Sequence, residues 1–359
     1  MNKNKFDVLT IGTATVDVFI KNDFKTISDF RHLSLLGFKT GKAQCFSLGS
    51  KIEIAEPFVS IGGGAFNAAV TFARHGFKTA TLFNIGDDYW GKLILQNTKK
   101  EKITPLVIVD KKRSSGQSFI LLNKTGERTV LVSRGCSGQI TLKEIPYDKL
   151  FASWVYVASG SIPFPVIERV LSLLKKRGAK IALNPSKDML EKGIRRLRKI
   201  FNWCQVVFLN REEASYLTGI NYLKTKEIFK KLDESVSGVA VMTDGEKGAY
   251  VSDGKILYQA GVFKEKRVVD RTGAGDAFGS GFVAGLLEWE KKNFFSKDKN
   301  YKKNGFFDQK QIFYALKKAS ANATSVIEHL GANQGILTAK DFSHQKRWKN
   351  LKILIKKLK

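Results

Sequence analysis

The chain has 359 residues, 43% of them hydrophobic, and a formal net charge of +28 at neutral pH. This length and apolar content suit one large globular core and argue against a disordered or fibrous protein. No stretch approaches about 18 uninterrupted apolar residues, which excludes a conventional transmembrane helix. Asp7 and Asp17 interrupt the apolar run near the N-terminus, so this run predicts a buried first strand rather than a signal peptide.

Lysine and arginine are spread along the whole chain, with dense groups in residues 291–303 and 345–359. A spread of this kind is typical of a lysine-rich solvent surface and argues against a nucleic-acid partner. Residues 345–359 predict a last amphipathic helix docked on the domain, and a helix lying on a membrane surface is the alternative. Its apolar face would contain Trp348, Leu351, Ile355 and Leu358.

The three cysteines, Cys45, Cys136 and Cys204, are scattered and odd in number. This usage fits buried thiols in a reducing compartment, and a cytoplasmic location is expected. Neither the cysteines nor the four histidines show the spacing of a zinc site.

Strands and helices begin to alternate early in the chain. After the N-terminal strands, residues 61–77 predict a glycine turn and a helix, and residues 79–86 a strand. Residues 86–100 predict a second turn and helix, and 105–110 another strand. Residues 115–135 then predict a hairpin with the turn NKTGE and no intervening helix.

From residue 153 the alternation becomes regular. Strands are predicted at 154–159, 180–186, 204–210 and 239–244, with helices at 163–178, 188–202, 211–219 and 224–236. This order predicts an α/β fold with a mostly parallel central sheet covered by helices on both faces. Ligands bind such sheets at the carboxyl ends of the strands.

Two β-rich segments, at roughly 13–60 and 107–135, break the alternation. We expect them to pair as a small sheet that forms a lid over the ligand crevice. Because no repeat or proline-rich linker divides the chain, residues 1–359 are expected to form one domain with this lid.

The stretch DRTGAGDAFGSGF (270–282) has the strongest chemical signal. Three small residues precede Asp276, and an apolar helix to about Trp289 follows. Glycines let successive amides point into one hollow, and the positive end of the helix adds to the attraction for an anion. Gly279 and Gly281 predict a close approach of the helix to a neighbouring sheet.

Two other interpretations of this stretch stay open. It could be a plain tight connection, or a dinucleotide fingerprint, because its glycines nearly satisfy a GxGxxxG spacing. Asp276 argues against the dinucleotide, since its carboxylate would repel the pyrophosphate.

Taken together, the motifs resemble the ribokinase, or PfkB-type, family of carbohydrate kinases. The likeness rests on IGGGAFNAAVTFARHG near the start and DRTGAGDAFGSGF near the end. Between them IGDDYWG, LNPS, the NxxE spacing of Asn210 and Glu213, and VMTDGEKGAY follow in the family's order, so nearly the whole chain is covered. The resemblance implies a ribokinase-like three-layer sandwich with a β lid, and an ATP-dependent kinase that phosphorylates a hydroxymethyl group of a sugar.

The resemblance also implies roles for individual residues. Asp276 matches the catalytic base, although an isolated aspartate here could be only a helix N-cap. The amides of three neighbours match an anion hole for the transferred group: Gly273, Ala274 and Gly275. The positions that match acceptor binding are Asp17, Gly62, Gly63 and Asn67.

On the nucleotide side, Asn184, Asn210 and Glu213 match positions associated with the phosphates and with the water shell of Mg²⁺. Glu213 could instead be a simple surface residue of its helix. Thr243 and Gly245 match the lining of the nucleotide site, and Asn322 lies on the helix expected to border adenine.

Near the anion hole, the resemblance implies a site for a monovalent cation such as K⁺, held by Asp270, Thr272 and the carbonyls around Gly331. Arg271 departs from the family, which has a small or β-branched residue there. It could contact ATP phosphates or point to solvent.

Other functions stay open at this point. A nucleoside is the chief rival to a sugar as acceptor, and Phe24, Phe30, Phe38 and Phe46 could stack on a base or simply pack in the lid. A protein that senses a sugar or nucleotide without catalysis, or binds nucleic acid, is the alternative from another class. A homodimer could form through the lid.

Overall fold

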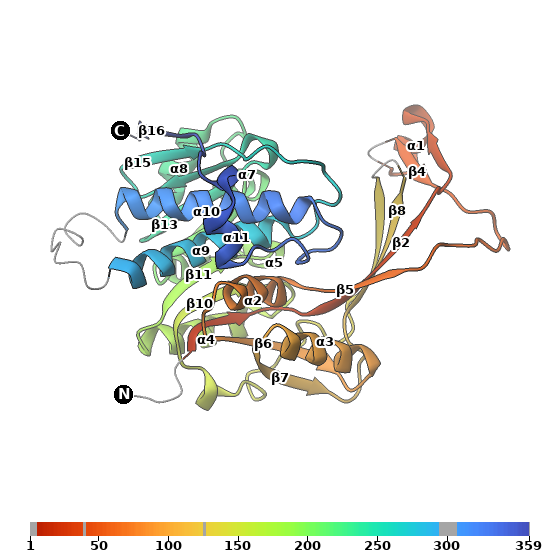
Figure 1. Cartoon of the computed structure of the whole chain (residues 1–359), viewed down its shortest axis with the longest axis horizontal. Helices are drawn as coiled ribbons and strands as arrows, with labels where there is room; N and C mark the ends of the chain where they lie inside the picture. Colours follow the sequence, from red (N-terminus) through yellow and green to blue (C-terminus); the bar gives the residue numbers. More distant parts are fainter. Residues whose placement is uncertain (1–5, 39–40, 125–126, 294–306, 359) are drawn as a thin grey trace.

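The computed structural model describes residues 6–38, 41–124, 127–293 and 307–358, which form three layers around one large sheet (Figure 1). The strand order of that sheet is β16-β15-β14-β13-β12-β11-β10-β1-β6-β7. In chain order these strands are β1 (Phe6–Ile11), β6 (Thr79–Gly86), β7 (Thr104–Asp110), β10 (Ala152–Ala158), β11 (Lys180–Asn184), β12 (Val206–Asn210), β13 (Val239–Thr243), β14 (Ala249–Ser252), β15 (Ile256–Ala260) and β16 (Ile353–Lys357). The strands from β7 to β13 run parallel and the last three pairings are antiparallel, which confirms the mostly parallel α/β sheet.

Side chains that alternate along each strand fill both faces of this sheet. In β10, Val155 and Val157 belong to one buried cluster, whereas Trp154 and Tyr156 belong to another. The helices of the first face are α4 (Phe164–Lys176), α5 (Lys187–Leu190), α6 (Gly193–Phe201), α7 (Arg211–Thr218) and α8 (Thr225–Asp233). Those of the second face include α2 (Gly64–Arg74), α3 (Tyr89–Lys100), α9 (Ala274–Asn293) and α10 (Gln309–Ile327). This two-sided burial explains the long apolar runs of the central strands.

A separate sheet of four strands projects from the body, as expected (Figure 1). Its order is β5 (Phe58–Gly62), β2 (Thr15–Asn22), β8 (Gln117–Asn123) and β9 (Arg128–Ser133). The predicted hairpin is present as β8 and β9, although residues 125–126 of its turn lie outside the described residues. At its far end a smaller unit contains β3 (Thr26–Ser28), α1 (Phe30–Leu35) and β4 (Lys42–Gln44). We refer to the four-stranded sheet as the small sheet.

Three expectations need correction. Residues 107–110 belong to β7 of the large sheet, because this strand pairs with β6 along its whole length. The helix expected at 188–202 is divided into α5 and α6, since Gly193, the first residue of α6, takes the left-handed conformation with φ of 77°. The third correction concerns the C-terminus.

The predicted last helix is wrong. After α11 (Ala339–His344), the chain ends in the short strand β16, which pairs antiparallel with β15. Strand pairing satisfies the backbone of a segment too short for a stable isolated helix. Trp348 is buried as expected, but Ile355 is 46% exposed. Most of the basic segment 291–303 lies outside the described residues.

A buried group of ionisable side chains joins α2, α9 and α10 away from the strand ends. The Lys318 ammonium lies 2.6 Å from Glu288 Oε1 and 3.1 Å from His75 Nδ1. Burial lowers the pKa of His75; the hydrogen bond to Glu288 opposes this shift, and the charge of Lys318 adds to it. Burial also lowers the pKa of Lys318 to about 8. The imidazole is therefore neutral in the folded protein at neutral pH.

We expect this neutral histidine to make the fold sensitive to acid. The unfolded chain takes up the His75 proton near pH 6.5, the ordinary pKa, whereas the folded protein takes it up only at lower pH. The unfolded state thus binds more protons just below that pH, and the free energy of unfolding falls on acidification. Urea unfolding at about pH 7.5 and about pH 5.5 should show a smaller fall in His75→Gln than in the wild type. The same change at exposed His344 should leave the fall unaltered.

Candidate active site

The predicted polar residues line up along the carboxyl edge of the large sheet. Thr243 ends β13 and lies in register with Asn210, which ends β12. Asn184 ends β11 in register with Ala158, which ends β10. This row leads to the start of α2, because a Cβ on Gly64 would lie 2.6 Å from the Ala158 side chain. One edge thus joins the expected nucleotide side to the expected acceptor side.

Asp276 lies at the centre of the site, on the first turn of α9. Asn67 of α2 donates from Nδ2 to Asp276 Oδ2 at 2.9 Å. Asn333, which sequence reasoning missed, donates from Nδ2 to Asn67 Oδ1 at 2.9 Å and to the Ile61 carbonyl at 2.5 Å. The bond from Asn333 orients the Asn67 amide, so that its NH₂ group faces the carboxylate.

The environment of Asp276 favours a carboxylate that can accept a proton. Burial raises the pKa of Asp276, and the hydrogen bond from Asn67 partly opposes that shift. A raised pKa makes the group a better general base as long as it stays ionised at the working pH. A Cβ on Gly64 would lie 3.5 Å from Asp276 Oδ1, so the glycine turn at residues 62–64 and this carboxylate are neighbours.

Asp17 of β2 lies beside the same turn and is 7% exposed. Burial raises the pKa of Asp17 to about 6, although hydrogen bonds from Ser118 and Thr15 lower it and the charge of Asp270 raises it further. Gly62 leaves room for the Asp17 carboxylate, because a Cβ at position 62 would overlap Asp17 Oδ2. Gly63 has φ of 94°, a conformation that favours glycine. The structure therefore brings Asp17, both glycines and Asn67 together.

Substitution of Gly62 by alanine should test this arrangement. The new methyl group would collide with the far end of the Asp17 side chain rather than with backbone, so the carboxylate would move while the fold persists. If Asp17 binds the acceptor, as the family resemblance implies, the KM for the acceptor should rise by about tenfold or more, with little change in the KM for the nucleotide. Added to Asp17→Asn, the substitution should cause no further loss; an additive loss would show that Gly62 acts elsewhere.

The small residues before Asp276 shape the first turn of α9. Gly273 has φ of 79° and packs against the backbone of Ala332, where a Cβ would clash. A Cβ on Gly275 would meet open space, so this turn borders a volume that a ligand can enter. The geometry suits an anion at the positive end of α9.

The glycines farther along α9 permit two different close contacts. Gly279 leaves room for the Tyr156 hydroxyl of β10, which confirms the expected approach to the sheet. Gly281 instead faces α10, at Ala319 and Asn322, so its neighbour is a helix. Tyr156 was not predicted as part of the site; burial raises the pKa of its hydroxyl, and the charge of Asp276 adds to this shift.

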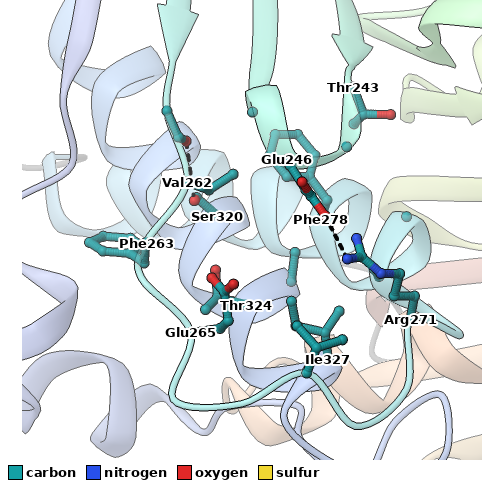
Figure 2. A pocket seen from close by; sticks show the side chains of 17 residues that line it. Thr243, Glu246, Val262, Phe263, Glu265, Arg271, Phe278, Ser320, Thr324 and Ile327 are labelled. Atoms are coloured by element: carbon teal, nitrogen blue, oxygen red, sulfur yellow. Dashed lines mark hydrogen bonds and ion pairs between the residues drawn. The ribbon is translucent and has the colours of Figure 1, made fainter. Parts of the chain in front are cut away.

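A cavity of about 340 Å³ opens beside the first turn of α9 (Figure 2). Thr243 and Gly245, the two residues expected on the nucleotide side, line it, and so do Ala274 and Gly275. Its walls are otherwise formed mainly by apolar and small side chains: Val262, Phe263, Val268, Phe278, Ala323 and Ile327. Apolar walls beside an amide-rich turn suit a flat ring joined to phosphate groups.

Arg271 lies at the rim of this cavity. Its Nη2 donates to Glu246 Oε1 at 2.6 Å, and both side chains line the pocket (Figure 2). Both are largely exposed, so this pair contributes little to stability and can exchange partners. The arginine is therefore placed where an incoming phosphate could replace Glu246.

Asn322, which was expected to border adenine, is not among the residues that line this cavity. Its side chain is fully buried, donates to Thr71 Oγ1 and the Ala277 carbonyl, and accepts from the Leu337 amide. The cavity wall on α10 is formed by its neighbours Ser320, Ala323 and Thr324 instead. Asn322 joins α10 to α2 and α9, a packing role that its sequence position did not reveal.

Asn210 and Glu213 bond to each other as a capping box at the start of α7. Glu213 Oε2 accepts from the Asn210 amide, and Asn210 Oδ1 accepts from the Glu213 amide, both at 2.8 Å. Burial raises the pKa of Glu213, while the bond from the Asn210 backbone lowers it. Glu213 Oε1 is not engaged by this box, which leaves one carboxylate oxygen for a hydrated cation.

Within the described residues, no three side chains of His, Cys, Asp or Glu converge as a metal-binding cluster. Mg²⁺ often binds through one or two carboxylates together with substrate phosphates and water. The single carboxylate of Glu213 is compatible with this type of coordination.

The aromatic residues proposed for base stacking lie in the unit beyond the small sheet. Phe24 and Phe46 pack edge to face, with ring centroids 5.6 Å apart. Phe30 and Phe38 are exposed on the same unit. The described contacts thus favour packing in this unit over contact with a ligand near Asp276.

Known proteins resemble this chain over most of its length. The model of the pfkB family carbohydrate kinases matches residues 37–339. Ribokinase from Haemophilus influenzae is 27% identical over 238 residues, covering 64% of this chain and 75% of that protein. Cytidine kinase from Thermococcus kodakarensis is 28% identical over 228 residues, covering 62% and 79%. The structure of Arabidopsis thaliana ribokinase complexed with ribose and ATP superposes with a TM-score of 0.72 at 18% identity, covering 96% of this chain and 99% of that one.

The fold, the site and these matches define the class of protein: a phosphotransferase that acts on an alcohol group of a sugar or nucleoside. The chain belongs to the pfkB family of carbohydrate kinases. The expected ribokinase-like fold is confirmed. Among the described residues, no helix has the length and apolar character needed to cross a bilayer.

Proposed function

We propose that this protein transfers the γ-phosphoryl group of ATP to a hydroxymethyl group of a sugar, with Asp276 as general base. One observation supports this most: Asp276 lies between the glycine turn at residues 62–64, which would hold the acceptor, and the cavity. Its carboxylate is bonded to Asn67 on one side, while the preceding residues Ala274 and Gly275 line the cavity on the other. A base between two binding sites is what direct transfer between them requires.

Different residues of the site would bind the acceptor, accept its proton, stabilise the transferred group and bind the nucleotide. Asp17 and Asn67, with Gly62 and Gly63, would hold the acceptor so that its hydroxyl faces Asp276. Asp276 would accept the hydroxyl proton as the oxygen attacks phosphorus, and the amides of Gly273, Ala274 and Gly275 would stabilise the negative charge of the transferred group. Thr243 and Gly245 would line the nucleotide site.

Mg²⁺ would neutralise charge on the phosphates when it is bound with the nucleotide. The residues that would hold it are Glu213, through water, and Asn184 and Asn210 at the ends of β11 and β12. Arg271 would exchange Glu246 for a phosphate oxygen when ATP enters.

The small sheet would act as the lid that covers the acceptor and excludes water during transfer. Asp17 supports this role, because it lies on β2 of the small sheet and faces the turn that precedes α2. The exposed apolar side chains Val130, Leu131 and Val132 on β9 would be covered by a second copy of the chain in a homodimer.

The acceptor can be identified by a panel of pentoses, hexoses and nucleosides incubated with ATP and Mg²⁺. Formation of a phosphorylated sugar would support the proposal. Selective phosphorylation of a nucleoside would establish the second candidate, which the likeness to a cytidine kinase favours. Absence of turnover with every acceptor, combined with salt-dependent retention on DNA, would favour a non-catalytic binding protein.

A further inference from the structure

An ion pair joins the small sheet to Asp270, which lies just before residues 273–275. We refer to residues 273–275 as the anion-hole turn. Arg128, the first residue of β9, donates from Nη1 to Asp270 Oδ1 at 2.7 Å. The Asp270 side chain is 1% exposed, whereas that of Arg128 is 37% exposed. A carboxylate buried to this extent needs a compensating positive charge, and truncation of its partner is costly. This pair therefore differs from the exposed ion pairs of the surface.

Asp270 also holds the chain on both sides of the anion hole. Its Oδ1 accepts from the Thr272 amide at 3.0 Å and from Thr272 Oγ1 at 2.7 Å. Its Oδ2 lies 3.4 Å from the Gly331 amide. Gly331 directly precedes Ala332, against whose backbone Gly273 packs. Asp270 thus fixes the turn whose amides would face the transferred group.

The same carboxylate was expected to bind a monovalent cation. Oδ1, however, already has three hydrogen-bond donors, one of them a guanidinium that carries the charge a cation would supply. The hydroxyl of Thr272 is directed at Asp270 as a donor. A cation bound here would have to displace the guanidinium, so these side chains do not fit a resident monovalent cation.

We propose that Arg128 is the counter-ion of Asp270 in place of a monovalent cation, and that it positions the anion-hole turn when the small sheet is docked. This inference rests on the proposed kinase function. Because Arg128 belongs to the small sheet, the positive charge reaches Asp270 only when that sheet lies against the body. Arg128 is a positioning residue: it acts on the reaction through Asp270 and the turn behind it.

The first test compares rates with and without K⁺ at constant ionic strength, with tetramethylammonium chloride as the replacement salt. The wild-type kcat should change by less than about twofold. Arg128→Gln should lower kcat by about 10- to 100-fold, because a hydrogen bond to a charged group is lost. Arg128→Lys should retain most of the rate, since it keeps the charge. The matched control Lys124→Gln removes a charge from the same hairpin, where Lys124 pairs with Asp23, and should act like the wild type.

The second test needs no turnover. Thermal unfolding midpoints are measured for the wild type and Arg128→Gln in KCl and in tetramethylammonium chloride. A K⁺-specific rise is expected in Arg128→Gln, where the emptied position can accept the ion, and not in the wild type. Specific stabilisation of the wild type by K⁺, or stimulation of its rate severalfold, would overturn the inference. If no acceptor is phosphorylated, the proposed function fails, whereas the thermal comparison still decides whether Arg128 occupies the cation position.

Discussion

Asp276→Asn should lower kcat by about 100- to 10,000-fold, the usual contribution of a general base. The amide cannot accept the proton of the acceptor hydroxyl, although it keeps the size of the side chain and can still accept from Asn67. Initial rates of product formation with the best acceptor of the panel provide the measurement. The KM for ATP should change little, because Asp276 is absent from the lining of the cavity.

The same variant should be at least as stable as the wild type. Burial raises the pKa of Asp276, which means that its ionised form is unfavourable in the folded protein. A neutral amide removes this cost, so the thermal midpoint should not fall. Asp148→Asn, the same change at an exposed residue, should alter neither rate nor midpoint. A full rate in Asp276→Asn would disprove the role of general base.

Asp17→Asn should mainly weaken acceptor binding. A hydrogen bond from a hydroxyl to a carboxylate contributes about 1.5–3 kcal/mol, so kcat/KM for the acceptor should fall by about 10- to 100-fold. The KM for ATP should stay within about twofold. Asp23→Asn, an exposed position just beyond the same strand, is the matched control. An unchanged KM for the acceptor would show that Asp17 does not contact it.

The pH dependence gives an independent check on Asp17. Its pKa is raised to about 6, so lowering the pH through 6 protonates the carboxylate and removes the charge that accepts hydroxyl hydrogen bonds. In the wild type the KM for the acceptor should therefore rise below pH 6, whereas in Asp17→Asn it should be flat over this range.

The order of strands and helices was predictable because each element has its own periodicity. The positions of Asp276 and Asn67 beside each other also followed, since the two glycine motifs open helices at the same edge of a sheet. The likeness to a family placed Thr243 and Gly245 at the nucleotide side, and the cavity includes both.

Contacts between segments that are distant in the sequence could not be predicted. Asn333 bonds to Asn67 across 266 positions, and Arg128 bonds to Asp270 across 142, and neither pair has a local pattern. The C-terminal strand was missed for a similar reason. Its apolar residues suit either a helix face or a strand, and only the open edge of β15 decides between them.

The two outer strands of the large sheet have a consequence for association. An open strand edge can pair with another molecule and lead to aggregation. At one edge β7 contains Pro105, which lacks an amide donor, and at the other β16 ends with exposed Lys356 and Lys357. Both edges thus discourage growth of the sheet from one molecule to the next. The proposed homodimer would therefore form through the exposed apolar side chains of the small sheet rather than through an edge of the large sheet.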